Sequence, residues 1–188
     1  MLIKWVKILL VVCLALVTTG LMLRYMDVTS AAFSFGFNFA QMFWASVLET
    51  QLKPALDSPF FNSYPFEKEG RVYRMLGVEW YRAILIKSGW EKLRQKSTPI
   101  RKSLHDFQAY ERASRVAEAG HLAAGVVVLI VTGYVMLAYS VRDALWLVVF
   151  NVLLNFYPVL LQRYTRPRLL RMIEKLKKSL PAFAGRLS

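Results

Sequence analysis

Residues 122–161 read LAAGVVVLIVTGYVMLAY (122–139), SVRD (140–143) and ALWLVVFNVLLNFYPVLL (144–161). Each apolar run has 18 residues. A helix of that length is about 27 Å long at about 1.5 Å per residue, which is close to the hydrocarbon core of a bilayer. The short connection forces the two helices to run antiparallel. The stretch therefore predicts a transmembrane hairpin in which the flanking positions 121 and 162 lie at nearly the same depth.

The composition fits a small membrane protein with several spans. The chain has 188 residues, 56% of them hydrophobic, and a formal net charge of +13, with a mean hydropathy of +0.35. The basic residues lie between and after the apolar runs, so we expect membrane lipids and not nucleic acid as partners. Cys13 is the single cysteine, which excludes an internal disulfide, and with His105 and His121 it makes no credible metal site.

Two further apolar stretches precede the hairpin. Residues 2–23 read as a retained anchor, because the run is long and lacks a small-residue cleavage site. Residues 31–48 are apolar but contain amides and serines, so they form either a second span or a segment in the interface. Thirteen Lys and Arg residues lie between positions 53 and 115, and eight between 163 and 186, which places both regions in the cytoplasm. This favours four spans with both termini inside over three spans with the N-terminus outside.

We therefore expect an all-α integral membrane protein with four transmembrane helices and additional amphipathic helices at the interface. Residues 1–48 form the anchor region, with one or two helices. Residues 49–117 form a cytoplasmic or interfacial segment, in which the apolar period predicts an amphipathic helix from about 71 to 87. Residues 118–165 form the hairpin with a polar cluster. Residues 166–188 form a basic amphipathic tail on the membrane surface.

Polar residues gather at the open end of the hairpin. Glu118 and His121 are three residues apart and share a helix face, where a carboxylate orients an imidazole and stabilises its protonated form. Asn155 shares a face of the second helix with Gln162 and Arg166. A base beside arginines at one membrane surface suits chemistry on a lipid-borne substrate. The alternatives are a histidine that binds a headgroup and amides that only hold helices together.

Three blocks carry a family resemblance: Phe66-Glu67-Lys68-x-Gly70, Glu118-x-x-His121, and Asn155 followed by Gln162-Arg163-Tyr164-x-Arg166-Pro167-Arg168. In order and approximate spacing they resemble the glycosyl-4,4'-diaponeurosporenoate acyltransferases of bacterial carotenoid synthesis. The similarity covers about residues 64 to 178. Those membrane enzymes esterify a sugar hydroxyl of a glycosylated C30 carotenoid with a fatty acyl chain. The resemblance implies a multi-pass O-acyltransferase of the bacterial inner membrane, and the basic residues place its active face in the cytoplasm.

We expect direct acyl transfer, because no serine is placed as a nucleophile and Cys13 lies in another helix. His121 is expected to take the proton from the acceptor hydroxyl as it attacks an acyl thioester of coenzyme A or acyl carrier protein, while Glu118 holds the imidazole. Asn155 and Gln162 are the amides nearest to the developing oxyanion. No bound cofactor is expected. Substrate binding falls to the other block residues, of which the arginines suit phosphates: Glu67, Lys68, Arg163, Tyr164, Arg166 and Arg168.

A non-catalytic role is the second hypothesis. The aromatic interface and paired helices would then bind a larger membrane assembly, and the polar face would only hold helices together. A lipid-binding or transport accessory is a third possibility. Substitution of His121 distinguishes these hypotheses, because an enzyme cannot lose its general base whereas a scaffold tolerates His121→Gln.

Overall fold

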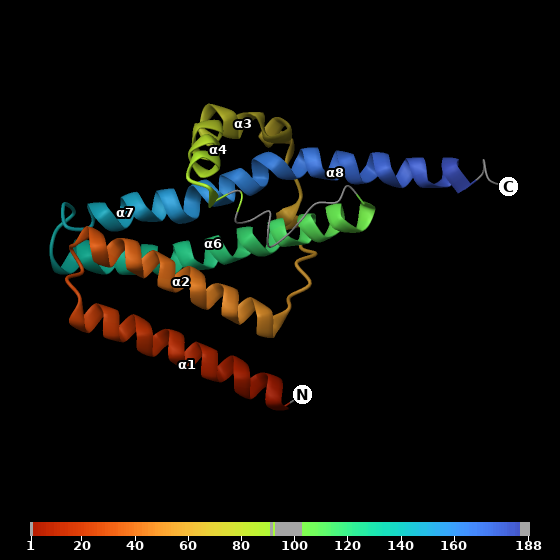
Figure 1. Cartoon of the computed structure of the whole chain (residues 1–188). Helices are drawn as coiled ribbons and strands as arrows, with labels where there is room; N and C mark the ends of the chain where they lie inside the picture. Colours follow the sequence, from red (N-terminus) through yellow and green to blue (C-terminus); the bar gives the residue numbers. More distant parts are fainter. Residues whose placement is uncertain (1, 91, 93–102, 185–188) are drawn as a thin grey trace. The chain divides into compact units, whose positions relative to one another are not determined.

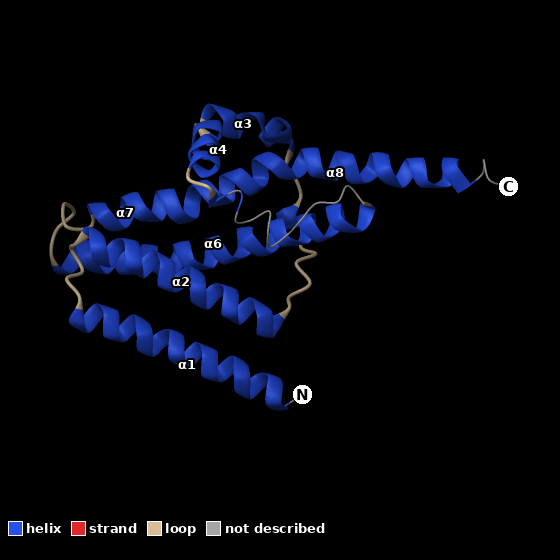
Figure 2. Cartoon of the chain, viewed as in Figure 1, coloured by secondary structure: helices blue, strands red, loops and turns tan. Residues whose placement is uncertain are grey.

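The computed structural model describes residues 2–90, 92 and 103–184, with the side chains of 68, 69 and 179–184 left aside. All regular structure in this part of the chain is helical (Figure 2). The chain divides into two compact units. The first contains Met1–Ala55 and Glu118–Val159, and the second contains Leu56–Ala117 and Leu160–Ser188.

The first unit is a bundle of apolar helices. Its elements are α1 (Leu2–Tyr25), α2 (Ala31–Leu52), the later part of α6 (Leu104–Ala138), α7 (Leu145–Asn151) and the π-helix η3 (Val152–Phe156). Helix α2 packs against both α1 and α7 (Figure 1). Ser30 begins α2, because its hydroxyl accepts the Phe33 N–H at 3.1 Å and so satisfies a free donor of the first turn.

The predicted hairpin is present. Its turn is closed by Ser140, whose Oγ donates to Asp143 Oδ2 at 2.7 Å and accepts the Asp143 N–H at 3.2 Å. Behind the turn, α2, α6 and α7 share an apolar core that includes Phe33, Phe37, Val128, Val131, Val135, Ala144 and Leu147. Helix α6 begins at Leu104, well before the predicted run, because the polar residues ahead of His121 continue the helix.

Three helical segments in the described part of the chain are long and apolar enough to cross a membrane: Leu2–Tyr25, Leu104–Ala138 and Leu145–Lys178. The expected count was four. The difference is α2, which has 22 residues but carries polar side chains that lower its hydropathy. Two of them, Asn38 and Gln41, are buried within the unit. The protein is an all-α membrane protein.

The second unit joins short helices to the ends of two long ones. It contains η1 (Pro59–Phe61), η2 (Pro65–Gly70), α3 (Arg71–Met75), α4 (Val78–Lys87), the first turns of α6, and most of α8 (Tyr157–Ala184). The prediction of a single amphipathic helix from 71 to 87 was wrong in one respect. It is divided into α3 and α4 at Gly77, whose φ of +79° lies in the left-handed region that ends a helix.

The basic tail is continuous with α8. Leu169 and Ile173 pack against Phe107 at the start of α6, so the apolar stripe faces protein in this unit. The opposite stripe is exposed and contains Arg168, Arg171, Lys175 and Lys178. The apolar stripe of the tail therefore contributes to a protein core, and the placement of the tail on the membrane surface stays a prediction.

Candidate active site

Three asparagines form a directed chain of hydrogen bonds in the first unit. Asn155 Nδ2 donates to Asn38 Oδ1 at 2.7 Å and to Asn151 Oδ1 at 2.9 Å. Asn38 Nδ2 donates to the Ser34 carbonyl at 2.8 Å, and Asn151 Nδ2 donates to the Gly125 carbonyl at 3.1 Å. All three asparagines are buried. We call Asn38, Asn151 and Asn155 the amide chain.

The two backbone carbonyls fix the orientation of every amide. A carbonyl only accepts hydrogen bonds, so Asn38 and Asn151 must turn their nitrogens to Ser34 and Gly125. Both then present an oxygen to Asn155, and only the nitrogen of Asn155 can face two oxygens. The remaining oxygen of Asn155 must therefore point the other way.

That oxygen faces His121. Asn155 Oδ1 lies 3.4 Å from His121 Nδ1, and the imidazole also makes a hydrogen bond with the backbone of Leu154. Because the Asn155 oxygen cannot donate, this contact favours the neutral tautomer of His121 that has its proton on Nδ1 and its lone pair on Nε2. Glu118 is fully buried one helical turn earlier on α6. Its predicted role toward the imidazole stays a prediction.

Two backbone features bring the cluster together. The π-helix η3 contains Asn155 and Leu154, and its wider turn is closed by the Tyr157 N–H donating to the Val152 carbonyl. Such turns are common at functional sites. Gly125 lets α6 approach closely, since an added Cβ would lie 3.3 Å from Asn155 Cβ.

In the second unit, the first and last family blocks interlock. Glu67 is 1% exposed and pairs with Arg163, with 2.7 Å between Oε1 and Nη1. Arg163 also donates to the Phe60 carbonyl at 2.9 Å. Gly70 has a φ of +88° and lies against the backbone of Tyr164, where an added Cβ would be 2.9 Å from the carbonyl oxygen. The first and last blocks therefore pack against each other in the second unit.

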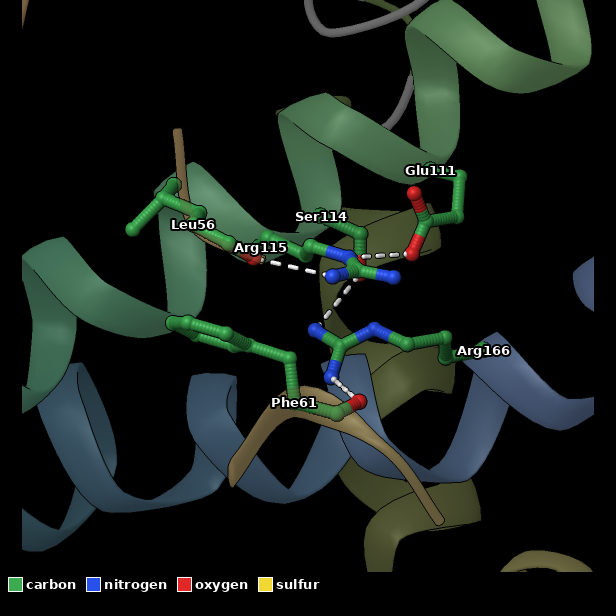
Figure 3. A network of polar contacts seen from close by, with 6 residues as sticks. All are labelled: Leu56, Phe61, Glu111, Ser114, Arg115 and Arg166. Carbon is green, nitrogen blue, oxygen red and sulfur yellow. Dashed lines mark hydrogen bonds and ion pairs between the residues drawn. The ribbon is translucent and has the colours of Figure 1, made fainter. Parts of the chain in front are cut away.

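Arg166 is buried and ties three segments of the second unit together. Its Nη1 donates to the Phe61 carbonyl at 3.0 Å and its Nη2 donates to Ser114 Oγ at 3.1 Å. Figure 3 shows its guanidinium beside that of Arg115, which donates to the Leu56 carbonyl and pairs with Glu111. In this arrangement Arg166, on α8, joins the end of η1 to α6.

Tyr164 and Arg168 belong to a third group of contacts. The buried Tyr164 hydroxyl donates to Glu79 Oε1 at 2.6 Å and accepts from Arg168 Nη2 at 2.9 Å. The hydrogen bond from Tyr164 lowers the pKa of Glu79 below its usual value. Arg168 also stacks over the Tyr164 ring at 4.4 Å, but it is the exposed member of the three block arginines.

Near Glu67, the α3 residue Tyr73 is held in its neutral form. Burial raises the pKa of Tyr73 to about 12, and its hydrogen bond with Glu67 acts in the same direction.

Two further residues were predicted to take part in the site. Gln162 is half-buried on α8, and the Lys68 side chain lies outside the described residues.

Sequence reasoning brought together His121 and Asn155 but omitted Asn38. One sequence feature could have indicated Asn38: it is an amide inside an apolar run, and burying an amide in a membrane is energetically unfavourable unless it forms hydrogen bonds. The hydrogen bond joins residues 38 and 155, which are far apart in the sequence, so no local sequence pattern predicts it. The arginines were expected to bind phosphates, which stays a prediction; in the structure Arg163, Arg166 and Arg168 each contact a separate set of protein groups.

No curated protein and no solved structure matches the chain significantly. A family model described as glycosyl-4,4'-diaponeurosporenoate acyltransferase matches residues 57–175, which is well over half of the chain and contains all three blocks. The protein therefore belongs to the glycosyl-4,4'-diaponeurosporenoate acyltransferase family of carotenoid biosynthesis.

Proposed function

We propose that this acyltransferase moves a fatty acyl group from an acyl thioester to a hydroxyl of a glycosylated carotenoid or a similar lipid-borne acceptor. The observation that carries the proposal is the orientation of His121. Its Nδ1 faces the oxygen of Asn155 at 3.4 Å, which supports Nε2 as the basic atom. A histidine with a defined tautomer beside buried polar groups is the arrangement that general base catalysis requires.

In the proposed reaction, His121 Nε2 takes the proton of the acceptor hydroxyl as that oxygen attacks the thioester carbonyl. The new C–O bond forms a tetrahedral intermediate, whose collapse breaks the C–S bond. The thiol leaves with the proton returned by His121. Water is not consumed and no covalent enzyme intermediate forms.

The supporting residues have distinct proposed roles. Asn155 was expected to donate to the oxyanion, but both N–H groups of its amide are directed to Asn38 and Asn151. We therefore assign Asn155 as the acceptor that orients His121. Glu118 would stabilise the imidazolium formed during transfer. Gln162 remains our candidate donor to the carbonyl oxygen.

Binding of the acyl donor is proposed for the second unit. Coenzyme A and acyl carrier protein both present phosphates, and a guanidinium binds phosphate oxygens in a forked manner. Among the block arginines, the exposed Arg168 suits this role best, whereas Glu67, Arg163, Tyr164 and Arg166 would shape its surroundings. A role for Lys68 stays a prediction. The excess of basic residues in this region favours the cytoplasmic face of the bacterial cell membrane.

The test is a lipid and pigment mass profile of cells that supply the glycosylated acceptor. Wild type and His121→Ala are compared at matched protein levels, with His105→Ala as the control because that histidine side chain is 93% exposed. We expect a species heavier by one fatty acyl group in wild type and in the control, and its loss in His121→Ala. Identical profiles in all three strains would overturn the proposal.

A non-catalytic subunit remains the competing function, because the amide chain by itself could hold α2, α6 and η3 together. The variant His121→Gln separates the two. It keeps a polar side chain of similar length but cannot relay a proton at neutral pH. Loss of product with an intact, stable protein supports the enzyme, whereas retained product excludes His121 as the base.

A further inference from the structure

We propose that Asn38 on α2 is a positioning residue of the acyl-transfer site, setting the tautomer of His121 through Asn155. The proposal rests on the proposed function of His121. It also extends the site beyond the family match, since the matched region begins at residue 57 and α2 precedes it. A helix outside the match thus completes the site.

The side chain of Asn38 is held in place by its own helix. Asn38 Nδ2 donates to the Ser34 carbonyl at 2.8 Å within α2 itself. This bond joins residues four apart in one helix, so α2 fixes the amide before any other helix contributes. The oxygen of Asn38 is thereby presented to Asn155 at 2.7 Å, the shortest bond of the amide chain.

Removing the Asn38 oxygen weakens the control of the Asn155 orientation. Without the Asn38 oxygen, Asn155 keeps Asn151 as a single acceptor and one of its N–H groups loses its partner. The orientation of the Asn155 amide then depends on Asn151 alone, so the rotated form, in which the nitrogen faces His121, becomes more populated. A nitrogen donor at that position favours a lone pair on His121 Nδ1 and moves the proton to Nε2, which is the atom that must accept the substrate proton.

The same helix provides a matched control. Gln41 is also a buried amide of α2, but its Nε2 donates to Thr19 Oγ1 of α1 at 3.0 Å and not to Asn155. If buried amides of α2 only hold the bundle together, Asn38→Leu and Gln41→Leu must act alike. If Asn38 positions His121, only Asn38→Leu changes the imidazole.

The experiment is nitrogen NMR of protein labelled with 15N-histidine, in lipid nanodiscs and in a His105→Ala background that leaves His121 as the only histidine. We expect wild type and Gln41→Leu to show a protonated Nδ1 and an unprotonated Nε2. Asn38→Leu should shift the tautomer ratio toward the Nε2–H form by up to about tenfold, the change that one net hydrogen bond supports. Asn38→Asp should restore the wild-type ratio, because either form of its carboxyl group presents an oxygen to Asn155.

Kinetics give the second readout. Asn38→Leu should lower kcat with little change in KM for either substrate, and Gln41→Leu should leave both constants near wild type. An unchanged tautomer in a folded Asn38→Leu protein would overturn the positioning role even if acyl transfer is confirmed. Conversely, a shifted tautomer in a protein without acyl transfer would uphold the geometry and reject the proposed function.

Discussion

The contact between Gly70 and Tyr164 predicts a specific cost for a single methyl group. In Gly70→Ala, the added Cβ would lie 2.9 Å from the Tyr164 carbonyl oxygen and 3.2 Å from Tyr164 Cα. Gly89→Ala is the matched control, because Gly89 also has a positive φ, +79°, but has nothing within 4 Å of the added Cβ. Both variants therefore share the backbone cost, and only the first adds a clash.

The magnitudes follow from these two parts. A left-handed backbone costs an alanine about 1–2 kcal/mol, partly offset by the lower entropy of its unfolded chain. Overpacking against a rigid backbone adds about 1–3 kcal/mol. Gly70→Ala should thus be less stable than Gly89→Ala by about 1–3 kcal/mol, which for a chain of this size lowers Tm by about 2–12 °C. Thermal unfolding of both proteins in the same detergent measures the difference. Equal Tm values would refute the close packing of the two family blocks.

Three further results are expected. Above pH 10 an unfolded tyrosine ionises, whereas Tyr73, with its pKa raised to about 12, stays neutral in the folded protein. The free energy of unfolding should therefore fall as the pH rises from about 10 to 12. Tyr73→Phe should flatten this dependence, and an unchanged slope in the variant would contradict the role of Tyr73. On a Cys13→Ser background, an impermeant maleimide should label Arg142→Cys in intact cells but Ser63→Cys only after permeabilisation, and the reverse pattern would invert the topology. Arg168→Ala should raise KM for acyl-coenzyme A by about tenfold without affecting acyl-pantetheine, which lacks phosphates; equal effects on both donors would exclude phosphate binding by Arg168.

The parts of the fold that were predictable from sequence are those with a strong local pattern. Two apolar runs separated by Ser140–Asp143 leave no other arrangement than an antiparallel hairpin. Helix boundaries were less accessible. The polar start of α6 lacks the apolar period although it belongs to the helix, and the amphipathic period of the tail does not reveal that the tail continues α8 without a break. The break at Gly77 was hidden for a related reason, since a glycine within an amphipathic period does not by itself reveal a positive φ.

The site was predictable in its chemistry but not in its connections. Spacing placed Glu118 one turn from His121, yet the hydrogen bond that orients the imidazole comes from Asn155 on another helix. The π-helix has no sequence period of its own. Arg166 is the clearest example of what the sequence could not predict. An arginine at the end of a span could equally well be a topology anchor, a phosphate ligand or a buried residue that connects segments of the protein. Only its contacts with Phe61 and Ser114 distinguish these roles.

The most direct test of the central claim is single-turnover acyl transfer by purified protein in nanodiscs. Ester product and released thiol are measured together, from an acyl thioester and a glycosylated carotenoid, for wild type, His121→Ala and His105→Ala. We predict equal amounts of ester and thiol in wild type and in His105→Ala, and a rate lower by on the order of 10²–10⁴ in His121→Ala, the usual contribution of a general base. A folded His121→Ala protein that transfers the acyl group at the wild-type rate would contradict the account.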